Sequence, residues 1–482
     1  MTRTATLVTI AALLFGALSV WALERQRTGL IAETTDIEGT PVTIWRLDPA
    51  RPAPLAVIAH GYAGSRQMME PIALSLAHAG FAAASFDFLG HGRHGAPITA
   101  DVTMIEGATA QLVAQTRQIA QTLLARPDLN GPAALIGHSM ATDIVIRAAE
   151  GLGPVAGVIA ISMYSDAVTP EHPQRLLVIS GETEYRLREV ALDRVRQVDP
   201  TAEEGDLATS GVVTRQAVSA PWVGHVGVLY ASNTLDAVQG WLGTGAQTAS
   251  GRGLWITALL GAIVALAWPL SRLIPQQTPA PPPGRATIWR AILLAPLPAL
   301  GATLVLPAGP MGLSGFAGLA GFFGIWGAMQ LAVLWRSGTW QPLFSVPAGA
   351  LLLAWGLGVF AVALDHYGAA FLPVGMRLWV MGLLLVGTLP FCVADAALAR
   401  GFSWPQWMVS RALIVATLLG AMVLTPGLAT TFTVLPVLVL FWVVYGLAAR
   451  WLSARAGAEG PGLALGIILA WAIAASTPLI GA

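Results

Sequence analysis

The sequence predicts a protein of two parts: an α/β domain built on a mostly parallel, doubly wound sheet, and an all-helical transmembrane domain after it. Hydrophobic residues make up 55% of the 482 positions and charged residues only 11%. Ordinary soluble proteins carry about 25% charged residues, so much of this chain must lie in lipid. Most Asp and Glu residues fall between about 24 and 252. Continuous apolar runs alternate there with helical patterns, which is typical of parallel strands covered on both faces.

The second half of the chain is a succession of apolar stretches from about residue 253 onward. Each is close to the ~20 residues that cross a hydrocarbon core about 30 Å thick. We count eight of them: 253–272, 287–307, 312–335, 343–364, 372–396, 406–425, 429–449 and 461–481. The proline-rich segment 275–284 is expected to be an extended linker between the first two.

The first residues of the chain predict a segment that enters the membrane. Arg3 precedes a long apolar run, and Val20 and Ala22 would permit cleavage after Ala22. The length of the run and Trp21 favour an uncleaved signal anchor over a cleavable signal peptide. The expected domains are therefore an N-terminal anchor at 1–23, the α/β domain at 24–250 and about eight transmembrane helices at 251–482.

The arginines between the spans predict the orientation. When these segments are assigned alternately to the two sides, the arginines fall on one side: Arg272, Arg285, Arg290, Arg336, Arg400, Arg450 and Arg455. The segments of the other set, 308–312, 365–371 and 425–431, contain no Lys or Arg. The positive-inside rule then predicts a protein of a bacterial inner or plasma membrane with its α/β domain on the periplasmic side.

Composition also argues against several partners. The formal net charge is zero and no basic patch stands out, so a nucleic-acid partner is not expected. Cys392 is the one cysteine, which excludes an internal disulfide. His91 and His94 lack further ligands at metal-binding spacing, so neither a metal nor a cofactor is expected. The ionisable residues of the apolar half lie near span ends, which disfavours a proton-coupled transporter.

The α/β domain is expected to carry its site where its strands end. We expect strands at 55–60, 81–88, 133–138, 155–162, 175–180 and 211–219, with an antiparallel lead-in from 31–37 and 41–47. In such sheets, ligands gather at the carboxyl ends of the strands. The motifs HGYAGS, GHSMA and GHVG all fall at such ends.

Ser139 lies at the corner between an expected strand and an expected helix. A nucleophile on so sharp a turn has a strained backbone, which requires small residues two positions away on either side. Gly137 and Ala141 meet this requirement. The turn also places the Met140 amide at a helix N-terminus, where it can donate to a developing oxyanion.

With these motifs the chain resembles the α/β-hydrolase family over roughly residues 25–245. The subgroup it most resembles contains monoacylglycerol lipases, serine aminopeptidases and dienelactone hydrolases. The resemblance implies that HGYAGS is the oxyanion loop, with the backbone amide of Tyr62 as the second donor. It also implies that the FDFLGHGRHG stretch, with Asp87, is architectural rather than catalytic.

The resemblance further implies a catalytic triad in the order serine, acid, histidine. Ser139 is the expected nucleophile and His225 the expected general base. The acid is expected after the seventh strand, where SGETEY offers Glu184 in place of the commoner aspartate, with Glu182 as a competitor. Serine needs an adjacent base because its hydroxyl is a weak nucleophile at neutral pH.

These expectations indicate a membrane-anchored serine hydrolase acting on a small-molecule or lipid ester at the bilayer. Only residues 163–174 separate the sixth and seventh expected strands, which is too short for a cap domain. Acyl transfer or peptide hydrolysis could use the same triad, because the acceptor decides the reaction. In another class of function, the domain would be a catalytically silent sensor that regulates a channel or transporter.

Overall fold

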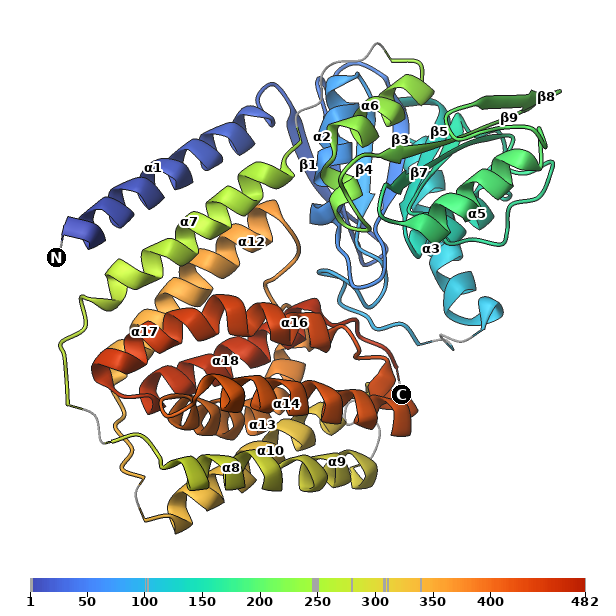
Figure 1. The fold of residues 1–482 in the computed structure, drawn as a ribbon. Coiled ribbons are helices and arrows are strands. Elements are labelled where there is room, and N and C mark those ends of the chain that lie inside the picture. Colours follow the sequence, from blue (N-terminus) through green and yellow to red (C-terminus); the bar gives the residue numbers. More distant parts are fainter. Residues whose placement is uncertain are drawn as a thin grey trace. The chain divides into compact units, whose positions relative to one another are not determined.

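The computed structural model describes residues 3–99, 101, 104–244, 251–278, 281–306, 309, 312–338 and 340–481. It divides into two compact units (Figure 1). The sheet unit comprises residues 19–257 and 366–370, and the helical unit comprises residues 1–18, 258–365 and 371–482. The domain boundary expected at residue 250 lies outside the described residues.

The sheet unit is built on a sheet of nine strands among its described residues, in the order β1-β2-β4-β3-β5-β6-β7-β9-β8. The strands are β1 (Ile31–Ile37), β2 (Thr40–Arg46), β3 (Ala53–Ala59), β4 (Ala82–Phe86), β5 (Leu129–His138), β6 (Gly157–Ile161), β7 (Arg175–Gly181), β8 (Leu207–Ser210) and β9 (Val213–Ala220). The six central strands are parallel. Strands β1, β2 and β8 pair antiparallel at the two edges. The mostly parallel sheet predicted from the sequence is confirmed.

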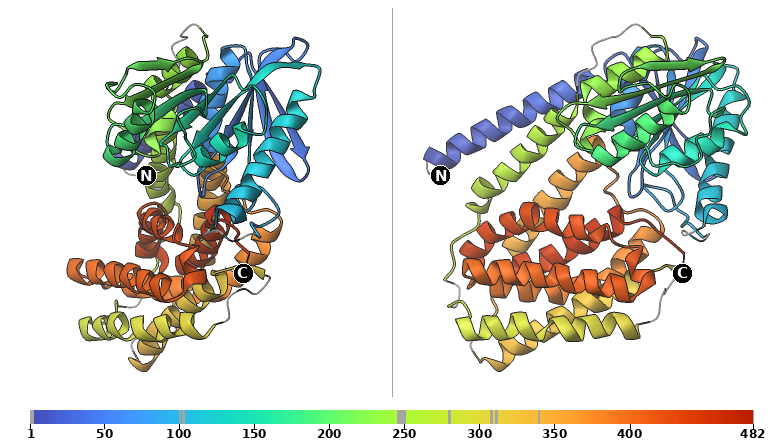
Figure 2. Two further views of the ribbon diagram at one scale, coloured as in Figure 1. Left: turned by 90° about the vertical axis from the view of Figure 1, so that its right-hand side faces the viewer. Right: turned by 45° about the vertical axis from the view of Figure 1, so that its right-hand side comes forward.

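Helices cover both faces of this sheet (Figures 1 and 2). They are α2 (Glu70–His78), α3 (Ala110–Leu124), α4 (Ala141–Ala149), α5 (Tyr185–Arg196) and α6 (Ser232–Trp241). Successive side chains of a strand point to opposite faces. Leu55 and Val57 pack in one core cluster with α3, α4 and α5. Ala56 and Ile58 pack in a second cluster with α2 and α6. Burial on both faces explains why the central strands are continuously apolar.

The hydrophobic pattern of the sequence predicts one helix over 104–126 and another over 225–243, and both differ from the observed elements. The stretch expected to be one helix over 104–126 begins with a π-helical turn, Ile105–Thr109, in which Gly107 has non-helical dihedral angles. The helix expected from residue 225 is a 3₁₀ turn, Gly227–Tyr230, followed by α6 after the extended residue Ala231. Residues 185–210, which lie between Glu184 and the last expected strand, contain α5 and the edge strand β8. No cap separates β6 from β7, as expected from the short connection.

The helical unit holds the apolar half of the chain. Its helices after residue 253 are α7 (Gly253–Ser271), α8 (Arg285–Leu294), α9 (Pro296–Val305), α10 (Phe316–Arg336), α11 (Val346–Leu353), α12 (Val362–Tyr367), α13 (Met376–Ala399), α14 (Trp404–Leu424), α15 (Pro426–Ala429), α16 (Val434–Phe441), α17 (Leu447–Ala456) and α18 (Glu459–Ser476). Two π-helical segments, Ala354–Ala361 and Trp442–Gly446, connect α11 to α12 and α16 to α17.

Nine helices within the described residues are long and apolar enough to cross a membrane. One is α1 (Arg3–Arg25), and eight follow residue 253. This is the number of apolar segments expected from the sequence. Small residues allow close packing inside the unit: the Cα of Gly387 on α13 lies against the Ala320 carbonyl of α10, and Gly466 of α18 packs on Leu389. Such contacts replace the hydrophobic driving force that lipid does not supply.

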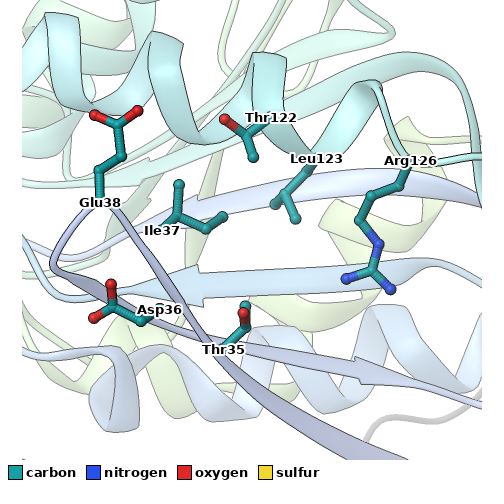
Figure 3. A pocket seen from close by; sticks show the side chains of 7 residues that line it. All are labelled: Thr35, Asp36, Ile37, Glu38, Thr122, Leu123 and Arg126. Carbon is teal, nitrogen blue, oxygen red and sulfur yellow. The ribbon is translucent and has the colours of Figure 1, made fainter.

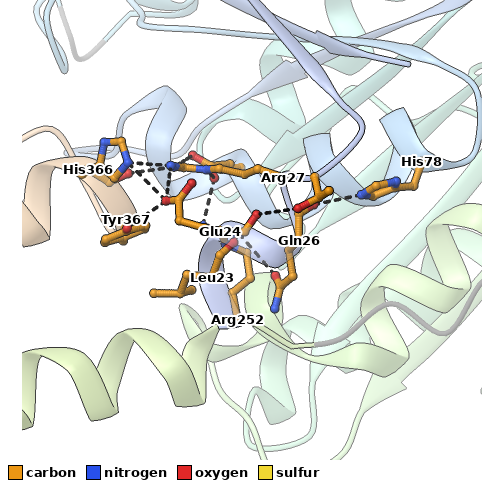
Figure 4. A network of polar contacts seen from close by, with 10 residues as sticks. Leu23, Glu24, Gln26, Arg27, His78, Arg252, His366 and Tyr367 are labelled. Carbon is orange, nitrogen blue, oxygen red and sulfur yellow. Dashed lines mark hydrogen bonds and ion pairs between the residues drawn. The ribbon is translucent and has the colours of Figure 1, made fainter. Parts of the chain in front are cut away.

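A polar cluster in the sheet unit joins segments that are far apart in the sequence (Figure 4). Glu70 at the start of α2 accepts from Arg27 Nε at 2.8 Å and pairs with Arg252 Nη2 at 2.9 Å. Glu24 pairs with Arg27 at 3.0 Å and accepts from the Tyr367 hydroxyl at 2.8 Å. Arg252 is 1% exposed. These contacts hold the residues before β1 and the residues after α6 against the start of α2. They also join the residues before β1 to the segment 366–370.

Candidate active site

Ser139 occupies the turn between β5 and α4, with a backbone φ of 53°. Its amide donates to the Ile161 carbonyl of the neighbouring strand β6 at 2.9 Å. A Cβ added at Gly137 would lie 2.5 Å from the Ala141 carbonyl oxygen and 2.8 Å from Val145 Cγ2. Only glycine fits there, because the helix turns back directly over the strand end. The spacing of small residues around Ser139 therefore follows from the tightness of this turn.

The structure brings Ser139, His225 and Glu184 together from the carboxyl ends of three parallel strands. His225 follows β9, and Glu184 follows β7 as the residue before α5. His225 Nε2 lies 2.8 Å from Ser139 Oγ. His225 Nδ1 lies 2.6 Å from Glu184 Oε1. This is the geometry in which an imidazole can take a proton from the hydroxyl while a carboxylate holds its tautomer.

The second oxygen of Glu184 has donors of its own. Glu184 Oε2 accepts from the Ser162 hydroxyl at 2.6 Å and from the Gly181 amide at 2.7 Å. Burial raises the pKa of Glu184, but the hydrogen bonds from His225, Ser162 and Gly181 outweigh it, so the net pKa is lowered. The carboxylate is thus held ionised beside the imidazole. No sequence motif singles out Ser162, although its place at the end of β6, between two strands that carry site residues, is a usable signal.

Glu182, the competing acid, is engaged elsewhere. Its Oε2 accepts from the Trp222 amide at 2.7 Å, and Trp222 has a positive φ of 61°. Glu182 therefore braces the turn that precedes His225. Within the described residues, no hydrogen bond joins Glu182 to the His225 imidazole.

The expected oxyanion loop passes directly over Ser139. A Cβ added at Gly61 would lie 3.0 Å from both Ser139 Cβ and His138 Nδ1. The close approach brings the backbone of Gly61 and Tyr62 to the serine from one side. Met140 is the N-cap residue of helix α4. Tyr62 follows Gly61 and Met140 follows Ser139, so their backbone amides remain the expected oxyanion donors.

Two buried histidines organise the surrounding loops. His60 donates from Nδ1 to the Gly61 carbonyl at 2.7 Å and accepts at Nε2 from the Phe88 amide at 3.1 Å. His138 lies 4% exposed beneath the His225 loop. Burial lowers the pKa of both His60 and His138 to about 4. Both rings are therefore neutral at pH 7. Among the described residues, no three His, Cys, Asp or Glu side chains gather as a metal site would require.

Asp87 braces the turn after β4, in keeping with its expected architectural place. Its carboxylate is fully buried. It accepts from the backbone amides of Arg66 and Arg93 at 2.8 Å and 3.0 Å, and it pairs with the Arg66 guanidinium. The bonds from Arg66 tie the end of the oxyanion loop to the end of β4, and the bond from Arg93 closes the turn after that strand. None of these contacts involves Ser139.

Several large apolar side chains that lie close in sequence to the catalytic candidates are exposed. Tyr185 is adjacent to Glu184, Val226 is adjacent to His225, and Trp222 lies three residues before His225. Their exposed fractions are 70%, 50% and 90%. Tyr164, two residues after Ser162, is 75% exposed. We call these four residues the apolar rim.

A separate hollow of the sheet unit lies away from these residues (Figure 3). It has a volume of about 290 Å³ and lies between the β1–β2 hairpin and the end of α3. Its lining includes Asp36, Glu38 and Arg126, and none of the catalytic candidates.

Residues 50–185 match the family model described as serine aminopeptidase, S33. The sheet unit has the α/β-hydrolase fold. The matched segment begins before β3 and ends just after Glu184, so it contains the oxyanion loop, Ser139 and the expected acid, but not His225.

Solved structures similar to the chain cover its α/β-hydrolase part. TT1662 from Thermus thermophilus is 20% identical, with 45% of this chain and 99% of that chain covered and a TM-score of 0.32. A dienelactone hydrolase from Anabaena variabilis is 17% identical, covering 43% and 92%, with a TM-score of 0.32. A membrane phospholipase A, described as a bacterial virulence factor, is 13% identical, covering 48% and 92%, with a TM-score of 0.32. No curated protein matches the chain.

Proposed function

We propose that the protein is a membrane-anchored serine hydrolase that cleaves carboxylic esters on the extracytoplasmic side of the membrane. The observation that carries this proposal is the hydrogen-bonded series from Ser139 Oγ through His225 to Glu184, at 2.8 Å and 2.6 Å. Its members come from three separate strand ends. A chance arrangement would not align both imidazole nitrogens in this way.

In the proposed mechanism, Ser139 Oγ attacks the ester carbonyl carbon and His225 Nε2 takes the hydroxyl proton. The carbonyl oxygen becomes an oxyanion, which the amides of Tyr62 and Met140 stabilise. Glu184 stabilises the imidazolium, which then protonates the departing alkoxide and leaves an acyl-enzyme on Ser139. Water, deprotonated by His225, attacks this ester in the same way and releases the acid.

The apolar rim supports an ester with an apolar acyl or alcohol part as the substrate. Tyr164, Tyr185, Trp222 and Val226 are exposed close in sequence to the catalytic candidates. The short β6–β7 connection supplies no cap that would cover them. An apolar substrate chain would remove these side chains from water, at about 25 cal/mol per Å² of apolar surface. Lipid and long-chain acyl esters fit this requirement better than small polar esters.

The arginine distribution supports the extracytoplasmic side. Residues 366–370 lie in an arginine-free segment and belong to the same compact unit as the α/β-hydrolase sheet. Four of the candidate spans separate the two in sequence. An even number of crossings returns a chain to the side it left, so the two are expected on one side.

Fusions to alkaline phosphatase, which is active only outside the cytoplasm, test the orientation. A fusion after residue 481 is expected to be active, and one after Arg336 inactive. The opposite pair of results would place the hydrolase in the cytoplasm.

Labelling by a fluorophosphonate probe tests the nucleophile. The full-length protein in detergent is expected to react, Ser139→Ala to lose all labelling, and Ser180→Ala to label like wild type. Ser180 is a suitable control because it is 1% exposed and its hydroxyl has no hydrogen-bond partner among the described residues. Labelling of Ser139→Ala at the wild-type level would refute the hydrolase mechanism proposed here and leave the silent sensor.

The family description favours one alternative, a peptidase with the same residues. Matched pairs of substrates separate the two. For one acyl group, we expect the p-nitrophenyl ester to be hydrolysed and aminoacyl p-nitroanilides to be left intact. We also expect the rate to rise from acetyl to octanoyl esters. Preference for the aminoacyl anilides would establish the peptidase instead, and formation of a new ester in the presence of added alcohols would establish an acyltransferase.

A further inference from the structure

A second hollow lies within the helical unit, remote in sequence from the catalytic candidates. It has a volume of about 690 Å³. The end of α13, the start of α14, the stretch from α16 to α17 and one residue of α18 line it. We call it the arginine pocket, because Arg400, Arg411 and Arg450 all contribute to its wall.

The lining of the arginine pocket carries an excess of positive charge. Asp395 is its one acidic residue, against three arginines. Asp395 binds Arg411 through two hydrogen bonds, of 2.6 Å and 2.9 Å. The Arg411 guanidinium also lies over the Trp442 ring, 4.7 Å from its centroid. Asp395 therefore offsets one of the three arginines, and the remaining formal charge of the lining favours an anion.

Buried donors in the lining also lack acceptors. Among the described residues, neither the indole N–H of Trp442 nor Nε of Arg411 has a hydrogen-bond partner. A buried donor without an acceptor is unfavourable, most of all where lipid replaces water. The two atoms are enclosed by protein, so an anion in the pocket would bind the other guanidinium nitrogens of the lining and not these donors. A planar guanidinium can bind two phosphate oxygens at once.

The rest of the lining is apolar. Phe402, Phe441, Leu447 and Leu465 contribute to it. Trp404 and Trp407, which also line the pocket, are stacked with their ring centroids 5.4 Å apart. Tryptophans of this kind gather where the hydrocarbon core meets the headgroups. A free phosphate ion would use the arginines but not these side chains, whereas a phospholipid would use both.

We propose that the arginine pocket binds an anionic phospholipid, with its phosphate on the arginines and the start of an acyl chain on the apolar wall. Basic pockets between membrane helices are known to take lipid headgroups. None of the catalytic candidates lines the pocket, so its occupant is not proposed as a substrate of Ser139. The proposal therefore does not depend on the proposed hydrolase activity.

Native mass spectrometry of the full-length protein with added phosphatidylglycerol tests the proposal. We expect one tightly bound lipid, and at least tenfold weaker binding in Arg400→Gln/Arg450→Gln. Arg336→Gln is the matched control, since Arg336 is also an exposed arginine at the end of its helix and does not line the pocket. It is expected to bind lipid like wild type.

Competition decides the nature of the ligand. Phosphatidylcholine, which has no net charge, is expected to bind at least tenfold more weakly. Inorganic phosphate and glycerol phosphate at millimolar concentration are expected not to displace the lipid. Displacement by either would show a site for a soluble anion and overturn the proposal. Equal binding of phosphatidylglycerol to wild type and the double arginine variant would also overturn it, and elution of the variant from gel filtration at the wild-type volume shows that it is folded.

Discussion

His138 donates from Nε2 to the backbone carbonyl of His225 at 2.8 Å. The bond joins the residue before Ser139 to the residue proposed as its base. The two rings also lie against each other, with centroids 5.0 Å apart. Since the His225 side chain is 47% exposed, neighbouring side chains restrain it only in part. The His138 bond therefore fixes the backbone from which the imidazole reaches Ser139.

Replacing His138 should impair catalysis without removing a reacting group. We expect His138→Leu to lower kcat/KM about 10- to 100-fold, because a displacement of about 1 Å at a reacting group can have an effect of that size. His138→Gln, whose amide N–H can replace the Nε2 donor, should retain most of the activity. The measurement is hydrolysis of a p-nitrophenyl ester. Equal losses in the two variants would mean that the ring, and not its hydrogen bond, is what matters.

Glu184 and Glu182 should differ sharply when each is changed to glutamine. Glu184→Gln removes the charge beside His225 Nδ1 and permits the wrong tautomer, so we expect kcat to fall by about 10³- to 10⁴-fold. Glu182→Gln keeps an acceptor for the Trp222 amide and should reduce kcat less than tenfold. Steady-state kinetics on both variants give the comparison. The reverse ranking would assign the acid to Glu182.

Ser162 should influence the acid side of the pH profile. Its hydroxyl donates to Glu184 Oε2 and so favours the ionised carboxylate, whose pKa is lowered in the folded protein. Ser162→Ala removes this donor and raises the pKa of Glu184, so activity should be lost at a higher pH than in wild type as the solution is acidified. Ser180→Ala is the control. Superimposable profiles for all three proteins would contradict this role.

The two buried histidines should make stability depend on pH. Burial lowers the pKa of His60 and His138 from 6.5 to about 4. Between these values the unfolded chain binds protons that the folded chain does not, so the free energy of unfolding falls as the pH falls from about 7 to 4. Across this window, each histidine lowers the free energy of unfolding by on the order of 3 kcal/mol.

Fluorophosphonate labelling that survives a short heat treatment measures this stability in the full-length protein. The midpoint temperature should fall steadily from pH 7 to pH 4. It should fall by roughly half as much in His138→Gln, which has one such histidine fewer. A midpoint that does not change with pH in wild type would refute the assignment of two neutral buried rings.

Sequence patterns predicted the sheet because burial on both faces leaves a simple signal. The run around Val57 and Ile58 is apolar at every position, and the turn at Ser139 needs small neighbours that are visible in the chain. Contacts between distant segments leave no such signal. Ser162 contacts Glu184 across 22 residues, and His138 contacts His225 across 87. Helix breaks such as Gly107 also depend on local dihedral angles that hydrophobic periodicity does not encode.

Ser65 provides a further such contact within the sheet unit, next to the expected oxyanion loop. Its hydroxyl accepts from the Ala370 amide at 2.9 Å, and Ser65 is 2% exposed. Ser65→Ala would leave that amide buried without an acceptor, which costs about 1–3 kcal/mol. Because Ser65 is the last residue of the loop that carries Tyr62, we expect a lower thermal midpoint and a kcat/KM reduced several-fold. Ser180→Ala removes a hydroxyl from an equally buried serine that has no hydrogen-bond partner among the described residues, and it should change neither quantity. If both variants behaved like wild type, residues 366–370 would not support the oxyanion loop.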